Sequence, residues 1–179
     1  SCPLYLGMAV TAQPLVDVLM GAKWSEAAPL VAILALAMPV MTLHILFAPA
    51  LNALGLPNIV VRNSVFGAIL MPTVYVFAVQ YGADGLAWGW LVALPVLLAF
   101  TIYQARPHIG FSLTGLAGSV LPGLAAAAAM AALVWAADHL LLVRLWPDVP
   151  ALIHLLGLGL VGGLAYTAML WFGARQTFM

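Results

Sequence analysis

Long apolar stretches, separated by short polar turns, make up nearly the whole chain of 179 residues. The longest run without a charged side chain extends from Ala27 to Leu54, directly after a polar turn from Gly21 to Glu26. As an α-helix this run would be roughly 40 Å long, whereas the hydrocarbon core of a bilayer is only about 30 Å thick. The pattern therefore predicts a transmembrane helix that is tilted or bent.

The rest of the chain repeats this pattern, with proline, glycine and charged residues separating the apolar stretches. Each stretch is broadly long enough to cross a membrane as a helix, and the period-two alternation of a transmembrane β-strand is missing. We therefore predict an all-α fold, a polytopic membrane helix bundle with about six transmembrane helices. The predicted helices cover residues of about 3–20, 27–54, 59–81, 83–104, 113–142 and 149–172.

Composition and charge agree with a membrane protein and narrow the function. Hydrophobic residues make up 66% of the chain and charged residues only 6%, where a soluble domain has about a quarter. The net charge is zero and there is no basic cluster, so we expect no nucleic-acid partner. The sequence has no H-E-x-x-H, no zinc-type spacing of Cys and His, no G-x-S-x-G and no glycine-rich phosphate loop. We expect no enzyme activity, no catalytic residue, no metal and no cofactor.

The basic residues between the stretches predict the orientation of the chain. With the C-terminal tail and Arg175 in the cytoplasm, alternation puts Arg62 and Arg106 on the cytoplasmic side. Lys23 and Arg144 then lie on the outer side. This orientation keeps three of the five basic residues inside, so we expect a multi-pass protein with a cytoplasmic C-terminus.

Prolines recur inside the predicted helices, where each removes a backbone hydrogen bond and presses on the preceding turn. We therefore expect kinks, which fit either irregular packing or hinges for alternating access. Glycines cluster in the last two stretches, which favours close helix–helix contact in lipid. The prolines concerned are Pro39, Pro49, Pro72, Pro95 and Pro122.

Polar groups at membrane depth are the candidates for function, because burying them in hydrocarbon is unfavourable. His44 lies near the middle of the second stretch and shares a helix face with Ala48 and Asn52. This face either lines a hydrophilic cavity or makes an interhelical hydrogen bond in a packed core. Arg62 either snorkels to the headgroups or contributes to a site for a phosphate-bearing lipid. Our predicted cavity residues are His44, Asn52 and Arg62.

The other polar groups have simpler interpretations. His154 is a lone histidine, which we interpret as structural. Asp138 and His139 are adjacent, do not face one way along a helix, and are interpreted as interfacial. Gln104 and Arg106 lie at a helix end, where anchoring at the interface explains them.

Several motifs, in order along the chain, resemble the bacterial polysaccharide (oligosaccharide) flippase family. The anchor is Pro14-Leu-Val…Leu-Met-Gly21-Ala-Lys23-Trp24…Ala27-Ala-Pro29-Leu. Further motifs are Asn52-Ala-Leu-Gly55-Leu, Tyr81-Gly-Ala-Asp-Gly85-Leu-Ala, Pro122 to Met130, and the glycine-rich stretch from Gly157 to Tyr166. The family exports the repeat units of O-antigen, capsule and exopolysaccharide, and belongs to the larger group that includes multidrug-extrusion transporters and the lipid II flippase.

The resemblance implies that residues 1–179 are a fragment, most of the C-terminal lobe of a two-lobed transporter that works by alternating access. It implies an inner-membrane protein that flips polyprenyl-diphosphate-linked oligosaccharide from the cytoplasmic to the periplasmic leaflet. The implied partners are this lipid-linked oligosaccharide, membrane lipids and the missing N-terminal lobe of the same protein. In relatives the basic residues that bind the lipid phosphate lie largely on the absent helices, so none is transferred here.

Three other functions remain open at this point. A multidrug or small-molecule antiporter of the same superfamily would share the fold and need a membrane-embedded carboxylate, yet the acids here lie near helix ends. A membrane glycan polymerase or ligase would be an enzyme with a sizeable periplasmic loop, and the loops here are short. The third is a purely structural helical subunit.

Overall fold

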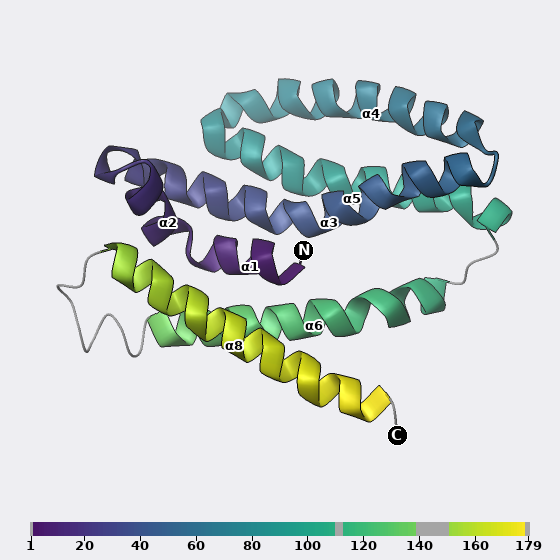
Figure 1. The fold of residues 1–179 in the computed structure, drawn as a ribbon. Helices are drawn as coiled ribbons and strands as arrows, with labels where there is room; N and C mark the ends of the chain where they lie inside the picture. Colours follow the sequence, from purple (N-terminus) through teal and green to yellow (C-terminus); the bar gives the residue numbers. More distant parts are fainter. Residues whose placement is uncertain (1, 110–112, 139–150, 178–179) are drawn as a thin grey trace. The chain divides into compact units, whose positions relative to one another are not determined.

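A computed structural model describes residues 2–109, 113–138 and 151–177, and these residues form helices and turns without a strand. Figure 1 shows the α-helices as coiled ribbons. Their bounds are α1 Cys2–Val10, α2 Ala12–Leu19, α3 Ala28–Ala53, α4 Pro57–Ala78, α5 Gly82–Ile109, α6 Leu113–Ala137 and α8 Ala151–Thr177, with short 3-10 helices η1 Ala22–Ala27 and η2 Val79–Tyr81. The predicted all-α fold is confirmed for this part of the chain.

Several helices are long and apolar enough to cross a membrane. Among the described residues three stretches qualify, Ala22–Ala53, Pro57–His108 and Val120–Ala137, and a fourth if α1 and α2 count as one bent span. The apolar part of α8, Leu152–Ala168, is shorter. The protein is therefore compatible with a membrane location, but the predicted count of about six spans is not confirmed.

The helices extend through the prolines at which we expected kinks. Each of α3, α4, α5 and α6 is continuous across its internal proline positions. Neighbouring helices and local adjustment allow this in membrane proteins, because freed carbonyls find other partners. In the part of the chain that the structure describes, the sharp break within a predicted span lies elsewhere, between α1 and α2.

By contacts the chain divides into two compact units. Unit 1 contains residues 1–35 and 118–179, and unit 2 contains residues 36–117. Unit 1 therefore holds α1, α2, α8, the start of α3 and most of α6. Unit 2 holds the rest of α3 together with the whole of α4 and α5.

In unit 2, α4 and α5 form an antiparallel helical hairpin with closely approaching backbones (Figure 1). Gly89 makes this possible on α5, because a Cβ there would lie 3.1 Å from Val74 Cγ1 on α4. Phe66 and Phe100 stack across the pair with ring centroids 3.9 Å apart. Such close approach increases the number of dispersion contacts between the two helices, and these contacts are a main cause of helix association in lipid.

The turn between α4 and α5 depends on two glycines. Gly82 has a φ of 70°, which a residue with a Cβ adopts only with strain. At Gly85 a Cβ would lie 2.6 Å from the Cβ of Tyr81 and would also collide with the Ala78 carbonyl oxygen. The glycine spacing in this motif is therefore a requirement of the turn.

The end of α3 is closed by a Schellman motif on Gly55, whose φ is 73°. The Leu56 N–H donates to the Leu51 carbonyl at 2.9 Å, and the Gly55 N–H donates to the Asn52 carbonyl at 3.0 Å. Leu56 also packs against the buried cluster of Leu51, Ile59 and Ala105. Pro57 then begins α4 with its φ already suited to a helix.

In unit 1, the predicted helix over residues 3–20 is broken into α1 and α2. The two meet at Thr11 with a bend of 80°. Pro14 explains the position, because it has no N–H for the Val10 carbonyl and its ring presses on that carbonyl. The Thr11 hydroxyl donates to the Gly7 carbonyl at 2.9 Å and closes the end of α1.

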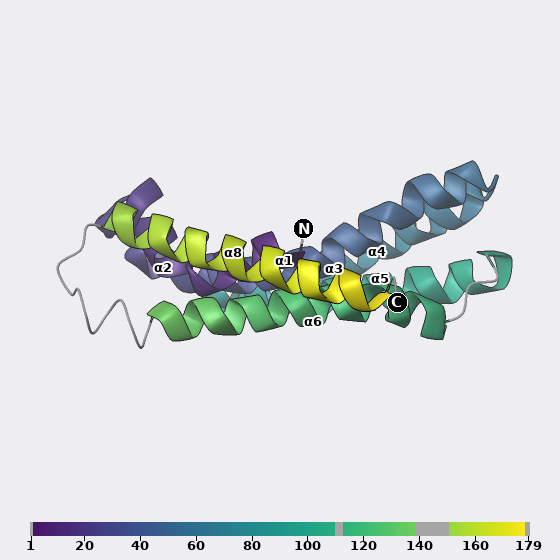
Figure 2. The same cartoon turned by 60° about the horizontal axis from the view of Figure 1, so that its bottom comes forward.

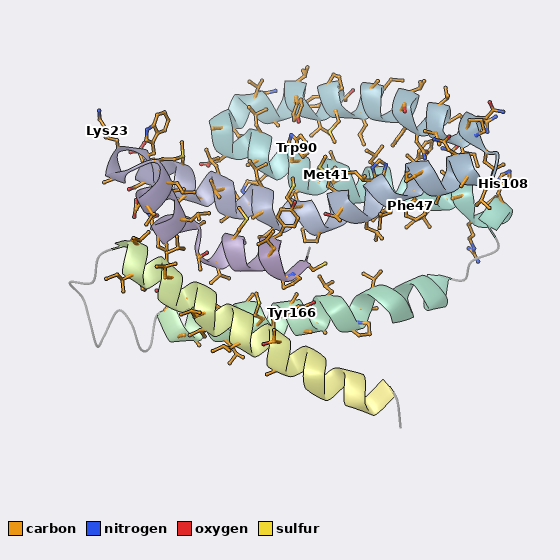
Figure 3. The ribbon with its side chains drawn as sticks, in the orientation of Figure 1. Lys23, Met41, Phe47, Trp90, His108 and Tyr166 are labelled. Atoms are coloured by element: carbon orange, nitrogen blue, oxygen red, sulfur yellow. The ribbon has the colours of Figure 1, made fainter. Side chains whose placement is uncertain are left out.

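The turn from α2 into α3 is held by polar side chains. Gly21 has a φ of 86° and directly precedes η1 as its N-cap residue. The Ser25 hydroxyl donates to Asp17 Oδ1 at 2.6 Å, which ties the turn to the end of α2. Lys23 is exposed on η1 and extends from it (Figure 3).

Also in unit 1, α8 packs antiparallel across α6 (Figures 1 and 2). Met130 and Val134 of α6 form a buried cluster with Leu158 of α8. Gly162 allows the close approach, because a Cβ there would lie 3.1 Å from Val134 Cγ2. The predicted role of glycine in this stretch is therefore confirmed at Gly162.

Candidate functional site: a polar pocket between α3, α4 and α5

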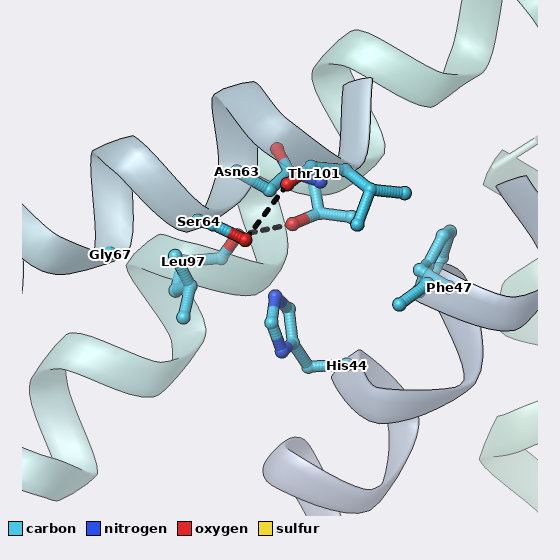
Figure 4. A pocket seen from close by; sticks show the side chains of 9 residues that line it. His44, Phe47, Asn63, Ser64, Gly67, Leu97 and Thr101 are labelled. Atoms are coloured by element: carbon cyan, nitrogen blue, oxygen red, sulfur yellow. Dashed lines mark hydrogen bonds between the residues drawn. The ribbon is translucent and has the colours of Figure 1, made fainter. Parts of the chain in front are cut away.

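Unit 2 contains a pocket of about 160 Å³ between its three long helices. Four of its lining side chains are polar: His44 from α3, Asn63 and Ser64 from α4, and Thr101 from α5. Figure 4 shows the His44 ring directed from α3 toward Ser64 and the facing helices. The apolar part of the lining is formed by Phe47, Ala48, Val60, Gly67 and Leu97. We call this site the unit 2 pocket.

The helical repeat places these residues on the inward faces. On α3, His44, Phe47 and Ala48 are three and four residues apart and share one face. On α4 the spacing from Val60 through Asn63 and Ser64 to Gly67 follows the same repeat, as does the pair Leu97 and Thr101 on α5. Three helix faces, each with at least one polar group, therefore converge on one cavity.

Hydrogen bonds fix three of the four polar side chains. Asn63 is 9% exposed, and its Oδ1 accepts from Gln104 Nε2 of α5 at 2.8 Å. The Ser64 hydroxyl donates to the Val60 carbonyl at 3.0 Å, and the Thr101 hydroxyl donates to the Leu97 carbonyl at 2.9 Å. Because each hydroxyl oxygen still has lone pairs, Ser64 and Thr101 can accept from a ligand.

The His44 ring makes no hydrogen bond to any part of the chain that the structure describes. A neutral imidazole offers one N–H donor and one acceptor nitrogen. Asn63 offers a further donor, since only its carbonyl oxygen is bonded to Gln104. The pocket therefore presents both donors and acceptors to whatever fills it.

The unit 2 pocket has no fixed charge. Its lining contains no Asp, Glu, Lys or Arg, and His44 is its one titratable residue. Groups of three or more His, Cys, Asp or Glu that could hold a metal ion are absent from the described residues. The arrangement suits an uncharged polar ligand better than an ion.

The three predicted cavity residues differ in their positions. His44 lines the pocket, with Ala48 beside it as expected from their shared face. Asn52, one turn further along α3, is exposed at the Schellman motif and does not line the pocket. Arg62 is exposed on α4 and also lies outside the lining, whereas its neighbour Asn63 points inward.

Asn63, Ser64, Thr101 and Gln104 were not among the site residues predicted from the sequence. A signal was present on α4, where the polar pair Asn63 and Ser64 and then Gly67 follow the helical repeat within an apolar stretch. Gln104, interpreted as an interfacial anchor, instead bonds Asn63 on the neighbouring helix. That pairing joins residues 41 positions apart, and periodicity within one helix cannot predict it.

Unit 1 also has a pocket, of about 330 Å³, and its lining is mostly apolar. Its polar lining residues are Thr11 and Tyr166, the latter on α8 (Figure 3). The rest of the lining comes from α1, α6 and α8: Pro3, Leu4, Gly7, Met130, Val134, Leu158, Gly159, Gly162 and Gly163. We call this site the unit 1 pocket.

His154 and Asp138 form a pair that the sequence did not predict. His154 Nε2 of α8 lies 2.9 Å from Asp138 Oδ1 at the end of α6. His154 is therefore not a lone histidine, whereas its structural role and the interfacial position of Asp138 stay predictions. His139, Arg144 and Asp148 lie outside the described residues.

Comparison with known proteins gives no match for this chain, whether to a protein-family model, a curated protein or a solved structure. Three of the motifs that resemble the flippase family contain Gly21, Gly55 and Gly82, which are the glycines with positive φ among the described residues. These motifs therefore have a local explanation in turn geometry. Membership of the flippase family stays a prediction.

Proposed function

We propose that this chain is part of a bacterial inner-membrane transporter that flips polyprenyl-diphosphate-linked oligosaccharide by alternating access. The observation that carries the proposal is the unit 2 pocket, a cavity with uncharged hydrogen-bonding groups between helices apolar enough to cross a membrane. The ordered motif resemblance supports the choice of cargo.

The unit 2 pocket supports a binding role over a packing role. The pocket measures about 160 Å³ and is open at the molecular surface, where Ser64 of its lining is exposed, so a ligand can enter it. Buried polar groups that serve only packing are normally hydrogen-bonded, yet the half-buried His44 ring has no such bond within the described chain. An open polar pocket between apolar helices would shelter a hydrophilic group while the lipid tail stays in the bilayer.

Export of surface glycan in cells tests this function. The full-length gene is deleted and complemented with wild-type protein or with a Ser64→Leu variant, which fills the pocket. We expect loss of surface glycan in the deletion strain and in the variant, with lipid-linked oligosaccharide accumulating in the cytoplasmic leaflet. The matched control is Thr73→Leu on the same helix, since Thr73 bonds its own helix as Ser64 does but lies outside the pocket. Normal glycan export in the deletion strain would contradict the proposal.

The orientation implied by a cytoplasmic C-terminus is tested separately. Single cysteines placed at Lys23 and Arg106 in a protein lacking Cys2 are labelled from outside the cell with a membrane-impermeant reagent. We expect labelling at position 23 and none at position 106 until the cells are opened. Labelling of both from the same side would contradict the orientation without removing the pocket.

A small-molecule antiporter is the second candidate, and the His154–Asp138 pair is the observation that favours it. Antiport of this kind needs a carboxylate that binds the coupling cation, and the Asp138 side chain, although it lies at the end of α6, is only 15% exposed beside His154. An antiporter would raise resistance to toxic cations in sensitive cells, and Asp138→Asn would abolish this resistance. A flippase would restore glycan export and leave resistance unchanged.

A further inference from the structure

We propose that the unit 2 pocket binds a single uncharged sugar unit of the cargo and does not bind its diphosphate. This inference rests on the proposed function and assigns one part of the substrate to one site. It uses residues that the motif resemblance does not include, chiefly Asn63, Ser64 and Thr101.

The lining of the unit 2 pocket offers hydrogen-bonding groups that match those of a sugar. Sugar hydroxyls both donate and accept, so their sites need partners of both kinds. The pocket offers donors from the Asn63 amide and the His44 ring, and acceptors from the Ser64 and Thr101 hydroxyls. Figure 4 shows these side chains around one space.

The Asn63 side chain is held in a fixed orientation by Gln104. Its Oδ1 accepts from Gln104 Nε2 at 2.8 Å, so the amide group is held from the neighbouring helix. The Nδ2 group is thereby left to donate elsewhere. Gln104 is a positioning residue in this account, because it lies outside the lining and acts through Asn63.

The lining of the unit 2 pocket has no lysine or arginine side chain. A diphosphate in a low-dielectric site requires cationic partners, usually Arg or Lys. The lining contains neither, and Arg62 and Arg106 are exposed outside it. The diphosphate must therefore find its partners elsewhere in the full-length transporter.

The size of the unit 2 pocket and the apolar part of its lining also suit one sugar ring. A volume of about 160 Å³ equals roughly five water molecules at about 30 Å³ each, which is room for one sugar ring. Phe47 and Leu97 form apolar surface in the lining, against which the C–H face of a sugar can pack. Small-ligand sites commonly combine such apolar walls with a few placed polar groups.

The test compares two probes on the full-length protein in lipid nanodiscs. One probe is lipid-linked oligosaccharide extracted from the producing cells, and the other is polyprenyl diphosphate of the same chain length without sugar. We expect the wild type to bind the glycosylated lipid more tightly than the bare diphosphate. We expect Asn63→Ala and His44→Phe each to weaken binding of the glycosylated lipid about tenfold and to leave the bare diphosphate unchanged.

Matched substitutions outside the pocket serve as controls. Asn58→Ala removes an exposed amide on α4, and His108→Phe removes an exposed ring at the end of α5 (Figure 3), and neither residue lines the pocket. Both variants should bind the two probes as the wild type does. Because Asn63→Ala also breaks the bond to Gln104, a Ser64→Ala variant removes one acceptor with less risk to folding.

The outcomes separate this inference from the proposed function. Equal affinity of the wild type for both probes, or equal losses for both probes in the variants, overturns the sugar subsite and leaves the flippase proposal standing. Unchanged binding of the glycosylated lipid in Asn63→Ala, His44→Phe and Ser64→Ala also overturns it. Binding of neither probe by the wild type overturns the flippase proposal itself, and the sugar subsite with it.

Discussion

Each unit has a pocket lined by residues of three helices, and these two pockets differ in what they can hold. The unit 2 pocket has polar side chains from all three helices, and His44 and Asn63 keep hydrogen-bonding capacity for a ligand. The unit 1 pocket is about twice as large but has only Thr11 and Tyr166 as polar lining. The Thr11 hydroxyl already donates to the Gly7 carbonyl.

The difference shows two ways of leaving space between apolar helices. In unit 1 the lining includes four glycines, and a Cβ at Gly159 or Gly163 would have no neighbour within 4 Å. In unit 2 the space comes from polar side chains that do not close on one another. Space lined by glycine favours contact with an apolar surface, whereas space lined by amide, hydroxyl and imidazole groups favours a hydrophilic ligand.

The largest expected effect is on the free energy of unfolding, when a glycine in each unit is replaced by alanine. Gly85→Ala in unit 2 forces a Cβ against the Ala78 carbonyl and Tyr81, so we expect a loss of about 3 kcal/mol in the free energy of unfolding. Gly159→Ala in unit 1 meets open space and should change it by less than about 0.5 kcal/mol. Reversible unfolding in mixed detergent micelles measures both. Equal effects would show that the turn can adjust.

The next largest effect is on glycan export, which should respond to a substitution in the unit 2 pocket but not to one in the unit 1 pocket. Ser64→Leu should lower glycan export at least about tenfold because the larger side chain fills the unit 2 pocket. Thr11→Ala should leave export within about twofold, since this hydroxyl serves the backbone of α1. Initial rates of flipping in proteoliposomes provide the measurement. A larger loss in Thr11→Ala would move the cargo site to unit 1.

A smaller effect is expected inside unit 1, between two adjacent glycines of α8. Gly162→Ala puts a Cβ 3.1 Å from Val134 Cγ2 and should destabilise unit 1 by about 1 kcal/mol. Gly163→Ala meets open space and should be neutral or slightly stabilising, because alanine restricts the unfolded chain. The same unfolding assay distinguishes them. The opposite order would contradict the packing of α8 on α6.

The smallest effect concerns the His154–Asp138 pair. Asp138→Asn removes the charge next to His154, and we expect a loss of about 0.6 kcal/mol, the average for polar interactions between membrane helices. Asp84→Asn, at an exposed position in the first turn of α5, is the comparison variant and should lose only about 0.3 kcal/mol, from the interaction with the helix dipole. A loss several times larger would show that the pair is a main link between α6 and α8.

The sequence predicted the helices well where an apolar stretch is long and its ends have glycine or proline. The predicted helix over 27–54 is α3, Ala28–Ala53, and its end at Gly55 is set by a Schellman motif. Such predictions succeed because a backbone in lipid must satisfy its hydrogen bonds within the helix. The prediction failed over residues 3–20, where Pro14 breaks the helix, although other internal prolines do not.

By itself, then, the amino-acid sequence determined that this chain is helical, apolar and turned at Gly21, Gly55 and Gly82, because these are local properties of the backbone and its solvent. It could not determine the pocket. The long helices are apolar on every side, and lipid and protein interior are equally apolar surroundings, so no pattern marks the inward face. Only the packing of α3, α4 and α5 selected His44 over Asn52 and Asn63 over Arg62.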